Sequence, residues 1–212
     1  DAHYPEEIRG LMRNREIRIN PVRDAAVDFT AVNAWTGPDG AAVLTERQAI
    51  RVPPQTGDDA VVFDFTWTLE ATENDIHIEP SDYGGLSVRL VGAPDTRRHL
   101  NSEGRTGSDC ADQPARWVSV AQPVDGFGEF TRETRDTYAY AGLALMDHPD
   151  NLCHPNRWRV DAYGMINPAF ALSRDVEIAR GDRLTLQYRL FAFPGMEDVE
   201  AIETQFSRWL ND

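Results

Sequence analysis

The chain has 212 residues, of which 41% are hydrophobic, and a net charge of −14. This composition supports a folded core and excludes a disordered chain. The excess of acid, with no basic cluster beyond Arg97-Arg98, argues against nucleic acid or an anionic membrane as a partner. All 21 basic residues are Arg, so lysine Schiff-base chemistry is excluded. No apolar run approaches the roughly 20 residues that span a bilayer.

Apolar and polar residues alternate with a period of two along most of the chain, which is typical of half-buried antiparallel strands. The clearest cases are 61–69, with Phe63, Phe65 and Trp67 on one face, and 183–191, with Leu184, Leu186 and Tyr188 on one face. We expect both faces to point into the core. The sequence TGPDG at 36–40 predicts a hairpin turn between two strands. The predicted strands are 15–20, 26–35, 41–52, 61–69, 75–79, 85–91, 115–121, 140–146, 158–163, 175–179 and 183–191.

Only the end of the chain has helical periodicity. Val199, Ile202, Phe206 and Trp209 share one face, and acidic residues occupy the first turn. About ten strands and one helix predict an all-β, antiparallel β-sandwich that forms a single domain over 1–212. Two polar segments, 92–114 and 122–137, are expected to be long loops of the kind that often carry function.

The densest group of reactive side chains follows the apolar strand at 140–146. There the sequence DHPDNLCHPN places His148 and His154 on a loop that contains two prolines. Histidine exchanges protons near neutral pH, so the loop is a candidate for acid-base chemistry. The HxxxxxH spacing matches no metal motif, and we predict neither a metal nor another cofactor. The alternative is a structural loop whose imidazoles bond backbone carbonyl groups.

Two other segments offer candidate polar groups. NSEGRTG supplies Asn101 and Glu103, and Glu103 is interpreted as a general acid or base, or as a solvated loop residue. Arg89, in SDYGGLSVR, could bind a substrate oxygen bidentately or pair with Asp82. Cys110 and Cys153 could form a disulfide or remain two free thiols, and the sequence does not decide between these alternatives.

The order of several motifs resembles a family of bacterial proteins labelled "methane oxygenase PmoA family". The resemblance spans about residues 15 to 210 and is most specific in the DHPxNxxHPxxW…YG…NP block. It is carried by YGGLSVR, NSEGRTG, ARWV, GLALMDHPDNLCHPNRWRVDAYGMINPAF and ARGDRLTLQYRLFAFPG.

This resemblance implies a β-sandwich of the mutarotase-like supersandwich type, with a role in sugar catabolism. The chain departs from the family pattern at Arg159 and Asp161, where members read His and Arg, and at Ala169, which is inserted before Phe170. Members also carry an upstream segment, so the chain is expected to lack part of the family domain, or a second polypeptide supplies it. The positions that match family motifs are Arg89, Asn101, Glu103, Gly104, His148, Asn151, His154, Trp158, Tyr163, Gly164 and Asn167.

We therefore expect a carbohydrate-active enzyme, a hydrolase or lyase that acts on a glycoside or an oxidised sugar. Glu103 and His148 would transfer protons. The predicted substrate-binding residues are Arg89, Asn101, Asn151, His154, Trp158, Tyr163 and Asn167, with Trp158 as a stacking wall. The alternatives are a non-catalytic carbohydrate-binding module or accessory subunit and a metal-dependent oxygenase. A small sugar or oligosaccharide is the expected partner, and the cytoplasm is the expected location.

Overall fold

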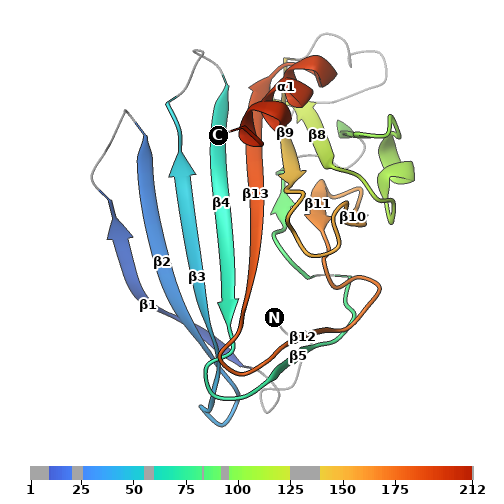
Figure 1. Ribbon diagram of the computed structural model, residues 1–212. Coiled ribbons are helices and arrows are strands. Elements are labelled where there is room, and N and C mark those ends of the chain that lie inside the picture. Colours follow the sequence, from blue (N-terminus) through green and yellow to red (C-terminus); the bar gives the residue numbers. More distant parts are fainter. Residues whose placement is uncertain are drawn as a thin grey trace.

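A computed structural model describes residues 10–20, 26–54, 60–82, 84–91, 96–124 and 139–211 (Figure 1). The predicted all-β class with one C-terminal helix is confirmed. None of the described helices is long and apolar enough to cross a membrane. The elements are β1 (Leu11–Ile19), β2 (Val27–Thr36), β3 (Ala42–Val52), β4 (Val61–Glu70), β5 (Ile76–Ile78), β6 (Val88–Arg89), β7 (Arg98–Asn101), a 3-10 helix (Gly107–Cys110), β8 (Trp117–Pro123), β9 (Tyr140–Asp147), β10 (Trp158–Val160), β11 (Met165–Pro168), β12 (Val176–Ile178), β13 (Arg183–Pro194) and α1 (Val199–Trp209).

One large sheet organises the molecule. Its eight strands run in the order β1-β2-β3-β4-β13-β9-β8-β7, and each neighbouring pair is antiparallel. A three-stranded sheet, β10-β11-β6, and a two-stranded sheet, β12-β5, complete the architecture. In Figure 1, α1 lies beside the end of β13, and β5 with β12 lies near the beginning of the same strand.

The apolar faces of β4 and β13 belong to the same side of the large sheet, because Phe65 pairs with Tyr188 and Trp67 with Leu186. On this side, buried residues of β8, β9 and β13 pack against Trp158 and Ile166 of the small sheet. The opposite side packs against α1. There Ile202 and Phe206 of the helix join Trp117, Ala144, Met146, Phe191 and Phe193 in a second buried cluster.

Specific polar contacts fix α1 on the sheet. Asp198 caps the helix, because its side chain accepts hydrogen bonds from the backbone N–H groups of Glu200 and Ala201. The Glu203 carboxylate accepts two hydrogen bonds from the Arg116 guanidinium, at 3.0 and 2.9 Å, and one from the Trp117 indole at 2.8 Å. These three contacts hold the middle of the helix against the start of β8.

Two sequence expectations differ from the structure. The predicted loop 92–114 contains β7 and the 3-10 helix, and β11 was not predicted. The inward side chains of β7 are His99 and Asn101, which are buried although they are polar, so no apolar alternation marks this strand. Most of the other predicted loop, 122–137, lies outside the described residues.

Candidate functional site

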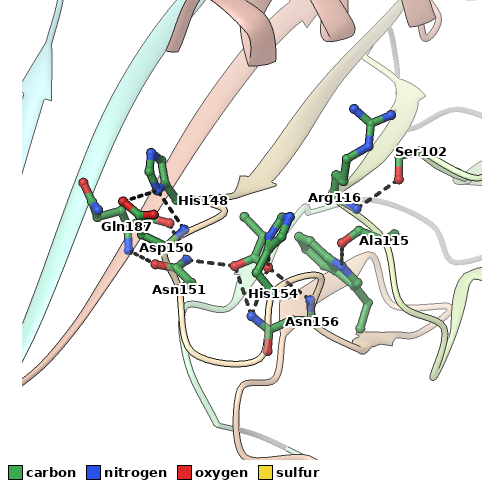
Figure 2. A network of polar contacts seen from close by, with 11 residues as sticks. Ser102, Ala115, Arg116, His148, Asp150, Asn151, His154, Asn156 and Gln187 are labelled. Atoms are coloured by element: carbon green, nitrogen blue, oxygen red, sulfur yellow. Dashed lines mark hydrogen bonds and ion pairs between the residues drawn. The ribbon is translucent and has the colours of Figure 1, made fainter. Parts of the chain in front are cut away.

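The DHPDNLCHPN loop is built around the buried carboxylate of Asp147, the last residue of β9. Asp147 Oδ1 accepts from Asn151 Nδ2 at 2.8 Å, and Oδ2 lies 3.0 Å from His154 Nδ1. The backbone N–H of Asn156 donates to Oδ2 at 3.1 Å, and its side-chain amide reaches both oxygens at 3.1 and 3.0 Å. Figure 2 shows Asn151, His154 and Asn156 converging at the centre of the loop. Most of the polar groups in this loop therefore stabilise the loop itself.

Asn151 also attaches the loop to β13. Its Oδ1 accepts from the backbone N–H of Gln187 at 2.7 Å, and its Nδ2 donates to the carbonyl oxygen of Gln187 at 2.6 Å. Tyr188, the next residue, pairs with Asp147 and is fully buried. Burial and the nearby charge of Asp147 raise the pKa of Tyr188 well above its usual value.

His148 differs from the other polar residues of the loop, because its ring lines a cavity. The ring lies edge-on to Trp209 of α1, with 4.9 Å between centroids. Its Nδ1 accepts from the backbone N–H of Asp150 at 3.2 Å and lies 3.6 Å from the Asp150 carboxylate. Among the residues that the structure describes, none forms a hydrogen bond with His148 Nε2.

The cavity beside His148 has a volume of about 740 Å³, within the range of small-molecule sites. Arg51, Asp64, Gln187 and Trp209 line it together with His148. Asp64 accepts two hydrogen bonds from the Arg189 guanidinium, at 2.6 and 2.9 Å. The same guanidinium lies 5.7 Å from the centre of the Trp209 ring. An imidazole, a carboxylate, a guanidinium, an amide and an indole thus surround one space.

The predicted catalytic pair Glu103 and His148 lies at one end of the sheet, since β7 and β9 both end there, on either side of β8. Two strand spacings separate β7 from β9 by about 10 Å. Glu103 is exposed and accepts a hydrogen bond from Ser102 Oγ at 2.9 Å. It is absent from the described lining of the His148 cavity. Figure 2 shows Ser102 and Arg116 on the opposite side of the loop from His148 and Gln187.

The proposed stacking role of Trp158 is wrong, because this side chain is fully buried in the core and donates to the Ala115 carbonyl oxygen at 2.8 Å. Asn101 is also buried, and its Oδ1 accepts from the backbone N–H groups of Glu103 and Arg105, which shapes the turn. His154 is committed to Asp147, and Asn167 is buried in β11. These four residues are positioned to support the fold rather than to contact a ligand in the cavity.

Arg89 and Tyr163 lie outside the His148 cavity. Arg89 is exposed on the three-stranded sheet, where its guanidinium lies 3.6 Å from the Met165 sulfur. Tyr163 is 65% exposed in a turn that Asp161 stabilises by accepting from the backbone N–H groups of Tyr163 and Met165. Both side chains remain accessible, but the structure does not bring them together with His148.

Sequence reasoning missed a second buried carboxylate, Glu46 of β3. It is 2% exposed and accepts from Asn33, Trp35, Gln48 and Trp67. Burial alone would raise the pKa of Glu46, but the four hydrogen bonds outweigh it and the pKa lies below its usual value. The sequence did contain a signal. Glu46 lies two residues after Leu44, so both side chains point to the same, buried face of β3.

Other candidate groups give no metal site. Within the described ranges, no group of three or more His, Cys, Asp or Glu side chains could hold a metal ion. Cys110 and Cys153 are free thiols. Burial, with the charge of Asp109, raises the pKa of Cys110 to about 11, so this thiol is a poor nucleophile.

Comparison with known proteins gives a family but no activity. A family model described as a family of unknown function, DUF6807, matches residues 3–207. No curated protein matches the chain. The match supports a family-level resemblance, whereas the PmoA label has no support in the description of this family. Because the matched region covers nearly the whole sequence, the chain belongs to the DUF6807 family.

Proposed function

We propose that this protein is a carbohydrate-active enzyme, a hydrolase or lyase that acts on a glycoside or an oxidised sugar in the cavity beside His148. The observation that carries the proposal is the set of groups around that cavity of about 740 Å³. Charged and amide side chains bind sugar hydroxyl groups, and an indole face packs against the apolar face of a sugar ring. Trp209 takes the stacking role first assigned to Trp158.

His148 is the proton-transfer group in this proposal. In the neutral ring, the hydrogen bond from the backbone N–H of Asp150 to Nδ1 leaves the proton on Nε2. In the protonated ring, Nδ1–H faces the Asp150 carboxylate at 3.6 Å. The imidazolium can therefore donate a proton from Nε2 to a leaving oxygen, while its Nδ1–H stays directed at the Asp150 carboxylate. In an elimination beside a keto group, Nε2 would take the proton from carbon.

The decisive measurement is turnover of a panel of aryl glycosides, uronides and keto-glycosides by the wild-type chain and by His148→Ala. Removing a general acid or base costs roughly 10²–10⁴ in rate, so we expect at least about a hundredfold loss of kcat with the fold retained. His77→Ala is the matched control, because His77 is a half-exposed histidine on β5 that pairs with Asp175 and Glu177. Equal kcat for wild type and His148→Ala would refute the assignment.

Glu103→Gln tests whether the second predicted catalytic residue takes part. If Glu103 transfers a proton, its loss also costs at least about a hundredfold in kcat. If it only shapes the turn, kcat stays near that of the wild type. The second outcome would leave His148 as the acid-base group of this cavity and remove Glu103 from the proposal.

A non-catalytic sugar-binding function is the second candidate. It is favoured by the placement of Glu103 outside the cavity lining, because among the described lining residues the one carboxylate, Asp64, is bonded to Arg189. Under this alternative, calorimetry detects sugar binding that Trp209→Ala weakens, and no member of the substrate panel is turned over. The two candidates are therefore separated by turnover, measured on the same sugars that bind.

A further inference from the structure

The cavity beside His148 continues across the large sheet as far as Arg51, near the end of β3. Arg51 pairs with Asp64 of β4, and Asp64 pairs with Arg189 of β13. Side chains at paired positions of neighbouring strands point to the same face of a sheet. Arg189 donates to the carbonyl oxygen of Gln205 in α1 at 3.3 Å, so this face is the one that carries the helix. Arg51, Asp64 and the His148 ring therefore line one space from the same side of the sheet.

The guanidinium of Arg51 is accessible to a ligand, because its side chain is 54% exposed. Within the described ranges, the one ion pair of this side chain joins Nη1 to Asp28 Oδ2 at 3.7 Å, which is longer than a hydrogen bond. Exposed ion pairs of this kind contribute little to stability. A ligand carboxylate can therefore replace Asp28 as the partner of the Arg51 guanidinium.

Arg51 also sets the sign of the charge in the cavity. Asp64 accepts two hydrogen bonds from the Arg189 guanidinium, so this pair is charge-balanced, and Arg51 adds a positive charge beside it. The whole chain has a net charge of −14 and repels an anion over most of its surface. A local guanidinium is therefore needed to bind an anionic ligand, and Arg51 supplies it at this cavity.

The span of the cavity indicates the length of its ligand. Three strand spacings, in the order β3-β4-β13-β9, separate Arg51 from the end of β9, where His148 follows, by about 14 Å. A molecule that contacts both side chains is therefore longer than one pyranose ring. Asp64 on β4 and Gln187 on β13 lie between them and can bind hydroxyl groups. The Trp209 indole, 4.9 Å from the His148 ring, offers a face for one sugar ring.

We propose that this cavity binds an acidic oligosaccharide, in which the carboxylate of a uronic acid ring pairs with Arg51 and a neighbouring ring lies beside His148. The inference names the substrate class of the proposed function, and it rests on that function for the nature of the ligand as a sugar. A guanidinium forms two parallel hydrogen bonds with a carboxylate, so Arg51 distinguishes an acidic ring from a neutral one. Because Arg51 binds away from the atoms on which His148 acts, it is a specificity residue and not a catalytic one.

The test is calorimetric titration of the full chain with cellobiouronate and with cellobiose. The two disaccharides share their linkage, and one carboxylate in the first replaces a hydroxymethyl group of the second. We expect cellobiouronate to bind at least about tenfold more tightly than cellobiose. This preference should shrink in 1 M salt, where charges are screened beyond about 3 Å.

Arg51→Gln should reduce the affinity for cellobiouronate to that for cellobiose and leave the affinity for cellobiose unchanged. Arg47→Gln is the matched control, because Arg47 is an exposed arginine on the same face of β3 that is absent from the described lining of the cavity. It should leave both affinities unchanged. Equal affinities of the wild type for the two disaccharides would overturn the proposal, as would the absence of any heat at millimolar cellobiouronate or an Arg51→Gln variant that keeps the preference. The wild-type comparison does not depend on any variant folding.

Turnover measured on the same two disaccharides separates this inference from the proposed function. If cellobiouronate binds more tightly but the wild type cleaves neither disaccharide nor any member of the glycoside panel, the catalytic proposal fails and the assignment of Arg51 stands. If the wild type turns over neutral glycosides in a manner that His148→Ala abolishes, and cellobiouronate has no advantage in binding, the catalytic proposal stands and the assignment of Arg51 fails.

Discussion

Glu46 and Glu197 are glutamates with buried carboxylate oxygens, but their surroundings differ. Glu46 accepts hydrogen bonds from four neutral side chains, and its pKa lies below the usual value. Glu197 has an unpartnered Oε1 among the described residues, and burial raises its pKa. A buried carboxylate with a full set of donors is stabilised in its charged form, whereas one that lacks a donor is shifted by burial toward its neutral form.

Asp147→Asn extends this comparison to a third carboxylate and has the largest expected effect. Asp147 is fully buried and accepts from Asn151, Asn156 and His154. The new amide turns a donor toward these donors, so we expect a loss of about 3–5 kcal/mol in the free energy of unfolding. Urea denaturation measures it. Asp150→Asn, with a mostly exposed side chain, should change stability by less than about 0.5 kcal/mol.

Glu46→Gln removes the charge but keeps the shape of the side chain. The amide has only one acceptor oxygen for the four donors, and its NH₂ group faces some of them. We therefore expect the free energy of unfolding to fall by about 2–3 kcal/mol. Two of the donors are the indoles of Trp35 and Trp67, so tryptophan fluorescence should change in the folded state. An unchanged denaturation midpoint would mean that the carboxylate contributes no more than a neutral amide.

Glu46 should make the free energy of unfolding depend on pH in the acidic range. Because the folded pKa lies below the usual value of 4.5, the ionised carboxylate stabilises the fold above that pH. This stabilisation is lost as the pH falls from 4.5 through the lower folded pKa. Denaturation curves at several pH values between neutral and strongly acidic conditions test this, and the Glu46→Gln variant should lose less stability over the same range than the wild type.

Glu197→Gln should act in the opposite direction and has the smallest effect. A carboxyl group with a raised folded pKa binds more protons in the folded state, so its cost appears as the pH rises above the unfolded value. Glutamine removes that cost, and we expect a gain of about 0.5 kcal/mol at pH 7 that disappears in acid. A loss of stability at neutral pH would indicate that the Glu197 carboxylate has a structural partner.

The fold was largely predictable because alternation along a strand reports burial directly. The strongly alternating segments became β4 and β13, and the helical spacing near the end became α1. The missed strands have different patterns. β7 turns the polar side chains of His99 and Asn101 inward, and the four residues of β11 are all buried, so neither alternates between apolar and polar residues.

The site was less predictable, because a sequence shows which polar groups are near one another but not which are already satisfied. Asn151, His154 and Asn156 lie within nine residues of Asp147, so their dense spacing was visible and suggested a reactive loop. Asp147 was visible in the sequence too. Only the geometry shows that its buried carboxylate binds all three side chains. The donors of Glu46 come from three strands, and only strand register brings them together.

Strand β1 forms one edge of the large sheet in the described part of the chain, and an edge strand can pair with a second copy. It exposes Ile17 and Ile19, at 66% and 78%, but it also carries Arg13, Arg15 and Arg18 and an irregularity in register after Asn14. Arg18 is paired with Glu16, but two such edges brought together would still oppose the guanidinium groups of Arg13 and Arg15. That repulsion acts over about 8 Å at physiological ionic strength and about 3 Å at 1 M salt. Concentrated salt should therefore favour self-association through this edge, and dilute buffer should keep the copies apart.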